Sequence, residues 1–509
     1  METKMKADEV AVIDFGSQYS QLIVRRIREI GYFAKLYLPS NLDEIEDPLA
    51  IVLSGGPQSV YSEESPSVDV DRLKQYDVPV LGICYGMQML TQQEGGTVKE
   101  SATREYGPAD VLVRTSDGLF QGLPDNLQVW MSHSDTVTDL PEGSEVLAHN
   151  RDDVPAAVQF DEELFGIQFH PEVSHTDRGT DVLENFLSLT DESPNFSMES
   201  YKEKAIREIE EKVGDKEVFC AVSGGVDSTV LSVLLHEADV DLRAVFIDTG
   251  LLRKDEVAEV QGQFRELGID IETVDASDEF LEAIEGVADP EEKRNIIGAK
   301  FLDVFFDTAG EIEMLAQGTL YPDVIESATS ESDADTIKTH HNRVNPILEL
   351  QKEGRVIEPL DELFKDEVRE LGSLLDIPHA TLYRHPFPGP GLAIRVPGEV
   401  TEQRLETLRE ADDIFIKTLK EWGWYDKVWQ GFCVLLPVKT VGVKGDRRSY
   451  ENAVSIRSVI SEDGMTADWS KLPDELLEEV SNKILNEVDG ISRVLYDIST
   501  KPPSSIEWE

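Results

Sequence analysis

The fold of this chain is built around the segment Val218-Phe219-Cys220-Ala221-Val222-Ser223-Gly224-Gly225-Val226-Asp227-Ser228-Thr229. Apolar residues dominate its first five positions, which predicts a buried parallel strand. Small residues then form a turn, and residues 230–236 continue as an apolar helix. A strand, a glycine loop and a helix in this order bring free backbone N–H groups and the positive end of the helix together. The segment therefore predicts a binding site for a phosphate or pyrophosphate.

The loop lacks the G-x-x-x-x-G-K-[ST] spacing of the common NTPase loop, so transfer of a γ-phosphate is not implied. It resembles the pyrophosphate loop of the N-type ATP pyrophosphatases, which release pyrophosphate and leave AMP on the substrate. The resemblance implies ATP binding, with Asp227 helping to hold Mg²⁺, a hard cation that bridges phosphate oxygens. The residues implied for ATP are Ser223, Gly224, Gly225, Val226, Asp227, Ser228, Thr229 and Asp248. A glycine turn that only permits close strand–helix packing is the alternative.

Length and composition indicate an ordinary globular protein. The 509 residues suffice for about three domains of ~100–200 residues, and 40% are hydrophobic. No run of ~18 apolar residues predicts a membrane span, and the first eight residues lack the apolar core of a signal peptide. The three cysteines, Cys84, Cys220 and Cys433, are far apart and odd in number. We therefore expect a cytoplasmic protein without a disulfide framework, in which Cys220 and Cys433 belong to the core.

The charge is strongly acidic, with 101 acidic and 47 basic residues and a formal net charge of −54. Nucleic-acid binding is disfavoured, because it depends on Lys and Arg that neutralise phosphates. Disorder is the other reading of such a charge, but apolar residues occur along the whole chain. We expect a surface adapted to high salt, where repulsion between carboxylates is screened within a few ångströms.

Alternating strands and helices predict an α/β fold, with polar residues at strand ends, where open sheets bind ligands. Residues 190–200 read as a linker, and the proline–glycine run 385–391 as a rigid connector that is neither helix nor central strand. The expected strands are 9–15, 50–53, 78–83, 110–114, 128–131, 156–160, 164–169, 218–222, 242–248, 433–438 and 453–459. The expected helices are 18–29, 200–213, 230–236, 280–286, 291–308, 403–422 and 474–488.

Gly82-Ile83-Cys84-Tyr85-Gly86 has the form of a tight strand-to-helix turn that presents a nucleophile. A helix N-terminus next to the thiol stabilises a thiolate. His170-Pro171-Glu172, at another strand end, supplies a base and a carboxylate to orient it. Backbone N–H groups of the turn at 54–57 and of Tyr85 could form an oxyanion hole. A lone cysteine in an apolar strand is more often a core residue, but the three pieces together favour thiol catalysis.

This set of motifs resembles the class I glutamine amidotransferases. The resemblance implies Cys84 as nucleophile, His170 as base and Glu172 as its partner. It also implies that glutamine and its oxyanion lie near Gly55, Gly56, Tyr85, Gln88 and the segment 132–135. We read His133 and His175 as structural or surface residues.

An amidotransferase followed by a pyrophosphatase loop resembles the glutamine-hydrolysing GMP synthetase family over the whole chain. The most specific segments are 293–298, 316–327, 338–342, 383–392, 490–497 and 501–509. The resemblance implies an amidotransferase domain (1–195), an adenine-nucleotide α-hydrolase-like ATP pyrophosphatase domain (196–390) and a small α+β dimerisation domain (391–509). It implies that ATP activates xanthosine monophosphate (XMP) as an adenylate, which ammonia from glutamine converts to GMP, in a homodimer.

For XMP the resemblance points to six side chains. Cations suit the 5′-phosphate, and an amide and a carboxylate suit polar edges of the nucleotide. The six are Arg384, Gln430, Arg448, Lys501, Glu507 and Lys365. A surface ion pair is the alternative for Lys365 and Arg448, and either Arg447 or Arg448 could face the substrate. His340 and His341 lack a set of partner ligands, so we expect no transition metal.

Other functions remain open at this point. An NAD- or asparagine-synthetase-like enzyme shares the loop but usually takes ammonia from other amidases, and nothing in it explains the run 385–391. A CTP synthetase shares the thiol domain but has a different nucleotide fold. A non-catalytic regulatory protein with degenerate sites is the third alternative, although no site position is visibly lost.

Overall fold

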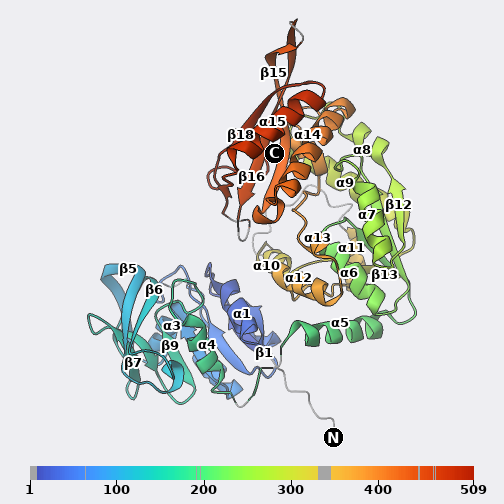
Figure 1. Cartoon of the computed structure of the whole chain (residues 1–509). Coiled ribbons are helices and arrows are strands. Elements are labelled where there is room, and N and C mark those ends of the chain that lie inside the picture. Colours follow the sequence, from blue (N-terminus) through green and yellow to red (C-terminus); the bar gives the residue numbers. More distant parts are fainter. Residues whose placement is uncertain are drawn as a thin grey trace. The chain divides into compact units, whose positions relative to one another are not determined.

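The computed structural model describes residues 9–62, 65–190, 192–194, 196–330, 345–444, 447–461, 464 and 466–509. The chain divides into two compact units, Met1–Ser200 and Tyr201–Glu509. Figure 1 shows a sheet with covering helices in each of them. Each unit has its own hydrophobic core.

The first unit is built on a nine-stranded sheet with the order β2-β1-β3-β4-β9-β8-β7-β5-β6. The five neighbouring strands β2, β1, β3, β4 and β9 pair in parallel. From β9 onward, β8, β7, β5 and β6 pair antiparallel. Its elements are β1 (Glu9–Ile13), α1 (Ser20–Glu29), β2 (Phe33–Tyr37), η1 (Pro39–Glu44), β3 (Ala50–Leu53), α2 (Val70–Leu73), η2 (Lys74–Tyr76), β4 (Val80–Ile83), α3 (Tyr85–Gln93), β5 (Thr97–Val113), η3 (Gly118–Phe120), β6 (Asn126–Asp139), β7 (Glu145–Asn150), β8 (Pro155–Gln159), β9 (Leu164–Ile167) and α4 (Gly179–Leu187).

The central parallel strands are apolar along their length because helices cover both faces. All residues of β3, β4 and β9 are buried, so the strands expected at 50–53, 78–83 and 164–169 are confirmed with small shifts at their ends. The edge strand β2 was missed. Its sequence Phe-Ala-Lys-Leu-Tyr is only partly buried, and its mixed polarity gives no clear strand period.

The second unit contains a parallel sheet with the order β12-β11-β10-β13-β14 and a four-stranded sheet in which β15, β17 and β18 all pair with β16. Its elements are α5 (Met198–Val213), β10 (Val218–Val222), α6 (Val226–Glu237), β11 (Leu242–Asp248), α7 (Glu256–Glu266), β12 (Ile271–Asp275), α8 (Ser277–Ala283), α9 (Pro290–Ala309), β13 (Met314–Ala316), α10 (Tyr321–Ser330), α11 (Asn345–Lys352), β14 (Val356–Ile357), α12 (Lys365–Leu374), α13 (His379–Leu382), η5 (Gly391–Arg395), α14 (Glu402–Glu421), η6 (Tyr425–Lys427), β15 (Gln430–Lys444), β16 (Arg447–Ile460), β17 (Asp468–Trp469), α15 (Asp474–Glu487) and β18 (Ile491–Asp497).

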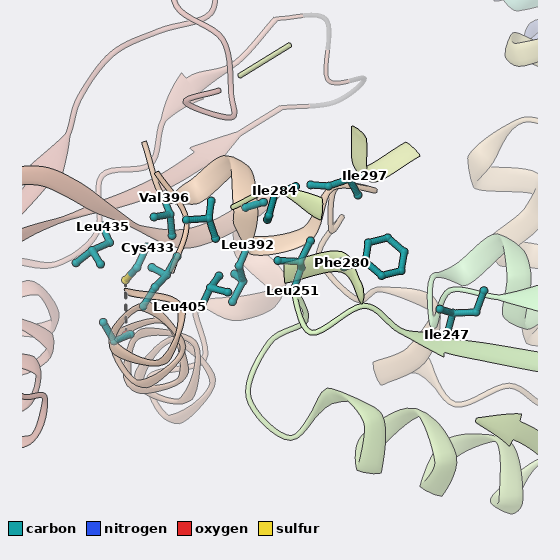
Figure 2. Close-up of a cluster of buried hydrophobic side chains, with 14 of the residues drawn as sticks. Ile247, Leu251, Phe280, Ile284, Ile297, Leu392, Val396, Leu405, Cys433 and Leu435 are labelled. Atoms are coloured by element: carbon teal, nitrogen blue, oxygen red, sulfur yellow. Dashed lines mark hydrogen bonds between the residues drawn. The ribbon is translucent and has the colours of Figure 1, made fainter. Parts of the chain in front are cut away.

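One hydrophobic core connects the two sheets of the second unit. Figure 2 shows Leu251 and Phe280, next to the parallel sheet, in the same cluster as Leu392 of η5 and Cys433 of β15. The proline–glycine run before η5 forms neither helix nor strand at residues 385–388, as expected. It therefore leads the chain from one sheet to the other while the core remains continuous.

The segment between α4 and α5 has no regular structure in its described part, as expected for 190–200. Helix α5 then begins at Met198 and leads into β10. No helix within the described ranges has the length and apolar character that a bilayer span requires.

Exposed carboxylates stand opposite the buried faces of the helices. In α15, Leu476, Val480 and Ile484 are buried at every fourth position, whereas Glu475 and Glu478 are exposed. The acidic residues of this helix therefore lie in solvent. Because salt screens interactions between solvent-exposed charges, it should weaken the repulsion between these carboxylates.

From this arrangement and the net charge of −54 we expect salt-dependent folding. Circular dichroism and activity should be largely lost near zero salt and recover as KCl rises toward ~1 M, where the Debye length is about 3 Å. An uncharged osmolyte at the same osmolality serves as the control and should restore less. Full native signal and activity in almost salt-free buffer would contradict the expectation.

Candidate functional site

The thiol of the first unit sits in a strained turn between β4 and α3. Cys84 has φ +53°, a conformation that L-residues seldom adopt. A Cβ on Gly82 would lie 2.6 Å from the Gly86 carbonyl carbon, and one on Gly86 would lie 2.6 Å from the Leu53 oxygen. The turn therefore closes only with glycine on both sides of the cysteine, and it holds the thiol at the carboxyl end of β4.

His170 and Glu172 follow β9, the neighbour of β4. Nδ1–H of His170 donates to Oε1 of Glu172 at 2.7 Å, and both side chains are buried. The ring of Tyr19 packs edge-on against His170, with centroids 5.1 Å apart. These contacts fix the imidazole so that Nε2 is left for the thiol, the arrangement that activates a nucleophile.

The pKa of His170 is raised well above its ordinary value of 6.5. Burial alone would lower this pKa, but the negative charge of Glu172 and the hydrogen bond and charge of Cys84 raise it. Oε2 of Glu172 is buried without a partner among the described residues. The carboxylate thus depends on the imidazolium for compensation, which favours a protonated His170.

Because the charge of Glu172 raises the pKa of His170, we predict that Glu172→Gln lowers this pKa. Because the folded pKa of His170 is raised, its protonation stabilises the protein below the unfolded pKa of about 6.5, and the stabilisation is lost as pH rises through the folded pKa. Removing the Glu172 charge should lower the folded pKa of His170. The readout is ¹³C NMR of labelled histidine, with His170→Asn to assign the signal.

Glu105→Gln is the matched control. Burial lowers the pKa of His133, and the charge of Glu105, whose Oε2 lies 3.4 Å from Nε2, opposes the shift. The control should move the titration of His133 further down and leave that of His170 nearly unchanged. An unchanged His170 midpoint in Glu172→Gln would contradict the assigned cause.

One cavity of about 300 Å³ is lined by Gly56, Tyr85 and Gln88 together with the expected nucleophile Cys84 and the expected base His170. Among the described residues, no acceptor bonds the backbone N–H of Gly56 or Tyr85. These two donors next to the thiol have the composition of an oxyanion hole. Gly55 adjoins the histidine instead, since a Cβ there would lie 3.1 Å from the His170 ring.

Gln88 is buried and already has partners. Its Nε2 donates to the Asp135 carbonyl and to Gln168 Oε1, both at 3.1 Å. Gln168 in turn donates to Cys84 Sγ at 3.5 Å. Sequence reasoning missed Gln168, although it lies directly after β9 and only two positions before His170.

His133 and His175 have different environments. His133 is buried, lines the cavity, and its Nδ1 lies 2.9 Å from the Asp135 oxygen. It is thus a structural part of the cavity wall, together with the rest of the segment 132–135. His175 is exposed and packs against Trp130 with ring centroids 4.6 Å apart, as expected of a surface residue.

In the second unit, β10 ends at the serine–diglycine loop and α6 begins at Val226. Gly224 has φ +73°, and a Cβ there would lie 2.6 Å from Val260 Cγ2. The Ser223 amide donates to Ser228 Oγ at 3.2 Å, which closes the loop on the first turn of the helix. The predicted anion-binding geometry of strand, loop and helix N-terminus is therefore present.

Lys365 lies at this loop. Its Nζ bonds both carboxylate oxygens of Asp227, at 2.6 and 2.5 Å. Arg384 donates to the Gly224 carbonyl at 3.2 Å and to Glu256 at 2.5 Å. Both cations line a cavity of about 270 Å³ together with residues 222–227. The structure thus places Lys365 and Arg384, two of the six residues expected for XMP, on the wall that carries the pyrophosphate loop.

Three of the residues expected for ATP do not line this cavity: Ser228, Thr229 and Asp248. Thr229 is fully buried and its hydroxyl donates to the Gly225 carbonyl at 2.8 Å. Asp248 accepts from the Gly250 amide at 2.9 Å. Their contacts shape the loop and the end of β11.

The remaining four residues expected for XMP lie in different surroundings. Gln430 Nε2 donates to Glu507 Oε1 at 2.9 Å and to the carbonyl of Pro386, a residue that lines the cavity, at 3.0 Å. Lys501 donates to the Gly464 carbonyl at 2.9 Å. Arg448 is exposed on β16, where it pairs with Val443 of β15. Of these four residues, Gln430 and Glu507 are hydrogen-bonded to each other.

Some expectations lie outside the described residues, namely those for the segment 338–342, with His340 and His341, and for the side chain of Arg447. The other two cysteines are core residues, as predicted: Cys220 and Cys433 are fully buried. Burial raises the pKa of Cys220 to about 11 and that of Cys433 well above its ordinary value. Neither thiol is activated.

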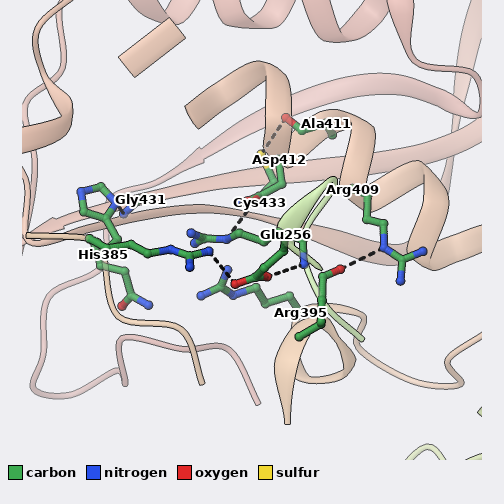
Figure 3. A network of polar contacts seen from close by, with 12 residues as sticks. Glu256, His385, Arg395, Arg409, Ala411, Asp412, Gly431 and Cys433 are labelled. Atoms are coloured by element: carbon green, nitrogen blue, oxygen red, sulfur yellow. Dashed lines mark hydrogen bonds and ion pairs between the residues drawn. The ribbon is translucent and has the colours of Figure 1, made fainter. Parts of the chain in front are cut away.

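A polar network joins the proline–glycine run to β15 (Figure 3). The Gly431 amide donates to Nδ1 of His385 at 3.2 Å, so Nε2–H donates to the Tyr425 carbonyl at 2.9 Å. Asp412 accepts from the Cys433 amide at 2.8 Å. Burial lowers the pKa of His385 to about 4, so this histidine is a neutral structural link.

Two family models match the chain: "Glutamine amidotransferase class-I" over residues 11–189 and "GMP synthase C terminal domain" over residues 417–508. Among curated relatives, the "GMP synthase [glutamine-hydrolyzing]" of Thermosipho melanesiensis is 52% identical over 98% of this chain and 99% of its own length. Those of Carboxydothermus hydrogenoformans and Aquifex aeolicus are both 51% identical over 99% of this chain and 100% of their own lengths. The chain therefore belongs to the glutamine-hydrolysing GMP synthases and is an enzyme of that family.

Proposed function

We propose that this GMP synthase uses Cys84, His170 and Glu172 to release ammonia from glutamine. The thiolate attacks the amide carbon, and the amides of Gly56 and Tyr85 stabilise the oxyanion. His170 transfers its proton to the leaving ammonia, and water then cleaves the thioester to give glutamate. The buried histidine–carboxylate pair next to a strained cysteine supports this assignment.

We propose that ATP places its β- and γ-phosphates on the loop from Ser223 to Gly225. The C2 oxygen of XMP attacks the α-phosphorus and pyrophosphate leaves, which gives adenyl-XMP. Ammonia then displaces AMP at C2 and GMP forms. Adenylation is needed because the C2 oxygen is a poor leaving group, whereas AMP is a good one.

The oxygen donors at the loop fit Mg²⁺, which prefers a few carboxylate ligands together with phosphate oxygens. Asp227 would hold the ion, and Lys365, which now neutralises Asp227, would then pair with the phosphates. When bound, Mg²⁺ would neutralise the charge that develops on the leaving pyrophosphate.

The ligand assignments are supported unequally by the geometry. Residues 223–227 and Arg384 line one cavity, and Gln430 with Glu507 adjoins it through Pro386. Ser228, Thr229 and Asp248 act through the loop they support. Lys501 and Arg448 remain assigned to XMP by the family resemblance, as do the domain divisions at 195 and 390.

A homodimer and a cytoplasmic location complete the proposal. Val438, Val441 and Val443 are exposed apolar residues on the β15–β16 hairpin, and their burial would favour self-association. Sedimentation at working salt will test whether the protein is a homodimer. A reducing compartment suits Cys84, because the mechanism requires a free thiol.

Incubation with ATP, glutamine and a panel of acceptors tests the function as a whole. AMP and pyrophosphate should appear only with XMP, in a 1:1 ratio with GMP. Formation of ADP and phosphate would overturn the proposal, and turnover of an NAD or asparagine precursor would favour the other pyrophosphatase-type synthetases.

A further inference from the structure

Arg395, at the end of η5, has no role in the proposed site so far. It is fully buried, and its guanidinium lies 4.1 Å from the Phe432 ring centroid and 5.2 Å from that of Phe387. Its Nε and Nη2 donate to the two carboxylate oxygens of Glu507, at 3.1 and 2.8 Å. Figure 3 shows Arg395 in the polar network that also contains Glu256 and His385. The bidentate pair holds Glu507 in one orientation.

The orientation of Glu507 decides that of Gln430. Because both oxygens of Glu507 accept from Arg395, the carboxylate presents only acceptors to Gln430. The amide must therefore turn its NH₂ toward Glu507 and the Pro386 carbonyl, as the distances of 2.9 and 3.0 Å show. The opposite amide orientation would set oxygen against oxygen.

The amide oxygen of Gln430 is consequently left without a partner in the described part of the chain. It is not among the fully buried polar atoms that lack a partner, so it keeps access to solvent although the residue as a whole is buried. The site thus offers a ligand one oriented acceptor, next to a residue that lines the cavity of the pyrophosphate loop.

Stability alone does not explain a buried arginine at this position, because burying a charge carries a desolvation cost. Its Nη1 is buried with no partner in the described residues, and buried ion pairs are often no more stable than apolar side chains of similar volume. The arrangement is explained if the pair is retained for the geometry it imposes.

We propose that Arg395 is a positioning residue which, through Glu507, fixes the Gln430 amide so that its oxygen accepts the N1–H of a 6-oxopurine. XMP carries that N1–H, whereas adenine has a lone pair at N1 and would meet the amide oxygen unfavourably. The contact thereby keeps adenine nucleotides, which the enzyme both consumes and releases, out of the XMP subsite. The inference rests on the proposed placement of XMP at Gln430 and Glu507.

The test is the ratio of dissociation constants for XMP and AMP, measured calorimetrically on the full chain with a non-hydrolysable ATP analogue filling the ATP site. In the wild type we expect AMP to bind at least about 100-fold more weakly than XMP, because a site built for one hydrogen bond rejects the ligand that lacks it. Arg395→Lys loses the bidentate clamp but keeps the charge. It should weaken XMP by about tenfold, raise KM for XMP more than it lowers kcat, and reduce the XMP:AMP ratio.

Glu507→Gln provides a second, nearly isosteric variant if Arg395→Lys fails to fold. Its neutral amide can pair with Gln430 in either orientation, so the XMP:AMP ratio should fall here too. Arg243→Lys is the matched control: this arginine also lies over a phenylalanine ring and pairs with a carboxylate, Glu272, but it does not contact Gln430. It should leave the ratio unchanged.

The outcomes separate the inference from the function beneath it. If Gln430→Leu leaves XMP binding unchanged, the proposed XMP subsite is wrong. If Gln430→Leu weakens XMP while Arg395→Lys and Glu507→Gln both keep the wild-type ratio, the subsite stands and the positioning role of Arg395 is overturned.

Discussion

Replacing Cys84 with alanine should abolish glutamine-dependent GMP synthesis and leave ammonium-dependent synthesis close to the wild-type rate. Without the thiol no acyl-enzyme forms, and the fall in the glutamine-dependent rate should be at least about 10³-fold, as for other hydrolytic triads that lose their nucleophile. The proposed adenylation site lies in the other compact unit, which has its own core, so added ammonium should bypass the loss. GMP formation is followed with saturating ATP and XMP and either nitrogen source.

Cys220→Ala is the control for the loss of a thiol as such. Cys220 is fully buried in β10 and its pKa is raised by burial, so it does not act as a nucleophile. This variant should retain the use of glutamine. Unchanged glutamine-dependent turnover in Cys84→Ala would disprove the thiol mechanism, and loss of ammonium-dependent turnover would show that the two sites are not separable.

Gly224→Ala should produce the opposite pattern, in which pyrophosphate release fails with either nitrogen source. The backbone at φ +73° disfavours any side chain, and the new Cβ would lie 2.6 Å from Val260 Cγ2. To relieve the clash the loop must move, and its amides then miss the phosphates. A displacement of about 1 Å at such a site costs roughly 100-fold in rate. Basal glutamine hydrolysis should persist.

Two further variants isolate the cause. Gly214→Ala imposes a similar strain, at φ +61°, but with no atom within 4 Å of the new Cβ, so it should lower stability and spare the rate of pyrophosphate release. Adding Val260→Ala to Gly224→Ala removes the clashing methyl group and should restore part of the rate. Equal rates for Gly224→Ala and Gly214→Ala would show that the loop position is not critical.

The geometry of the candidate catalytic motifs was predictable because each motif is local. The turn at Cys84 and the loop at Ser223 each consist of a strand, glycines and a helix that are contiguous in sequence, and short-range sterics suffice to predict their form. His170 and Glu172 are two residues apart and follow a strand that is apolar throughout. Their shared sheet edge follows from the rule that ligands collect at the carboxyl ends of parallel strands.

The assignments for XMP were harder, because they concern residues far apart in sequence. Lys365 and Arg384 are expected to bind XMP, and the structure shows that they contact Asp227 and Gly224, 138 and 160 positions away. No local pattern encodes such pairings, since they depend on how α12 and the proline–glycine run pack against the parallel sheet. The same holds for Gln168, whose importance is visible only from its contact with Cys84.

By itself, then, the sequence determined the α/β class, the two glycine-bordered turns, the position of His170 and Glu172 directly after a buried strand, and the burial of Cys220 and Cys433. Hydrophobic periodicity and backbone sterics act over a few residues and can be read directly. Only the tertiary structure decided which partners the isolated cations and amides have: Lys365 on Asp227, and Arg395 on Glu507 and through it Gln430. Charge and hydrogen-bond capacity are properties of single residues, but their partners are chosen by the packing of the whole unit.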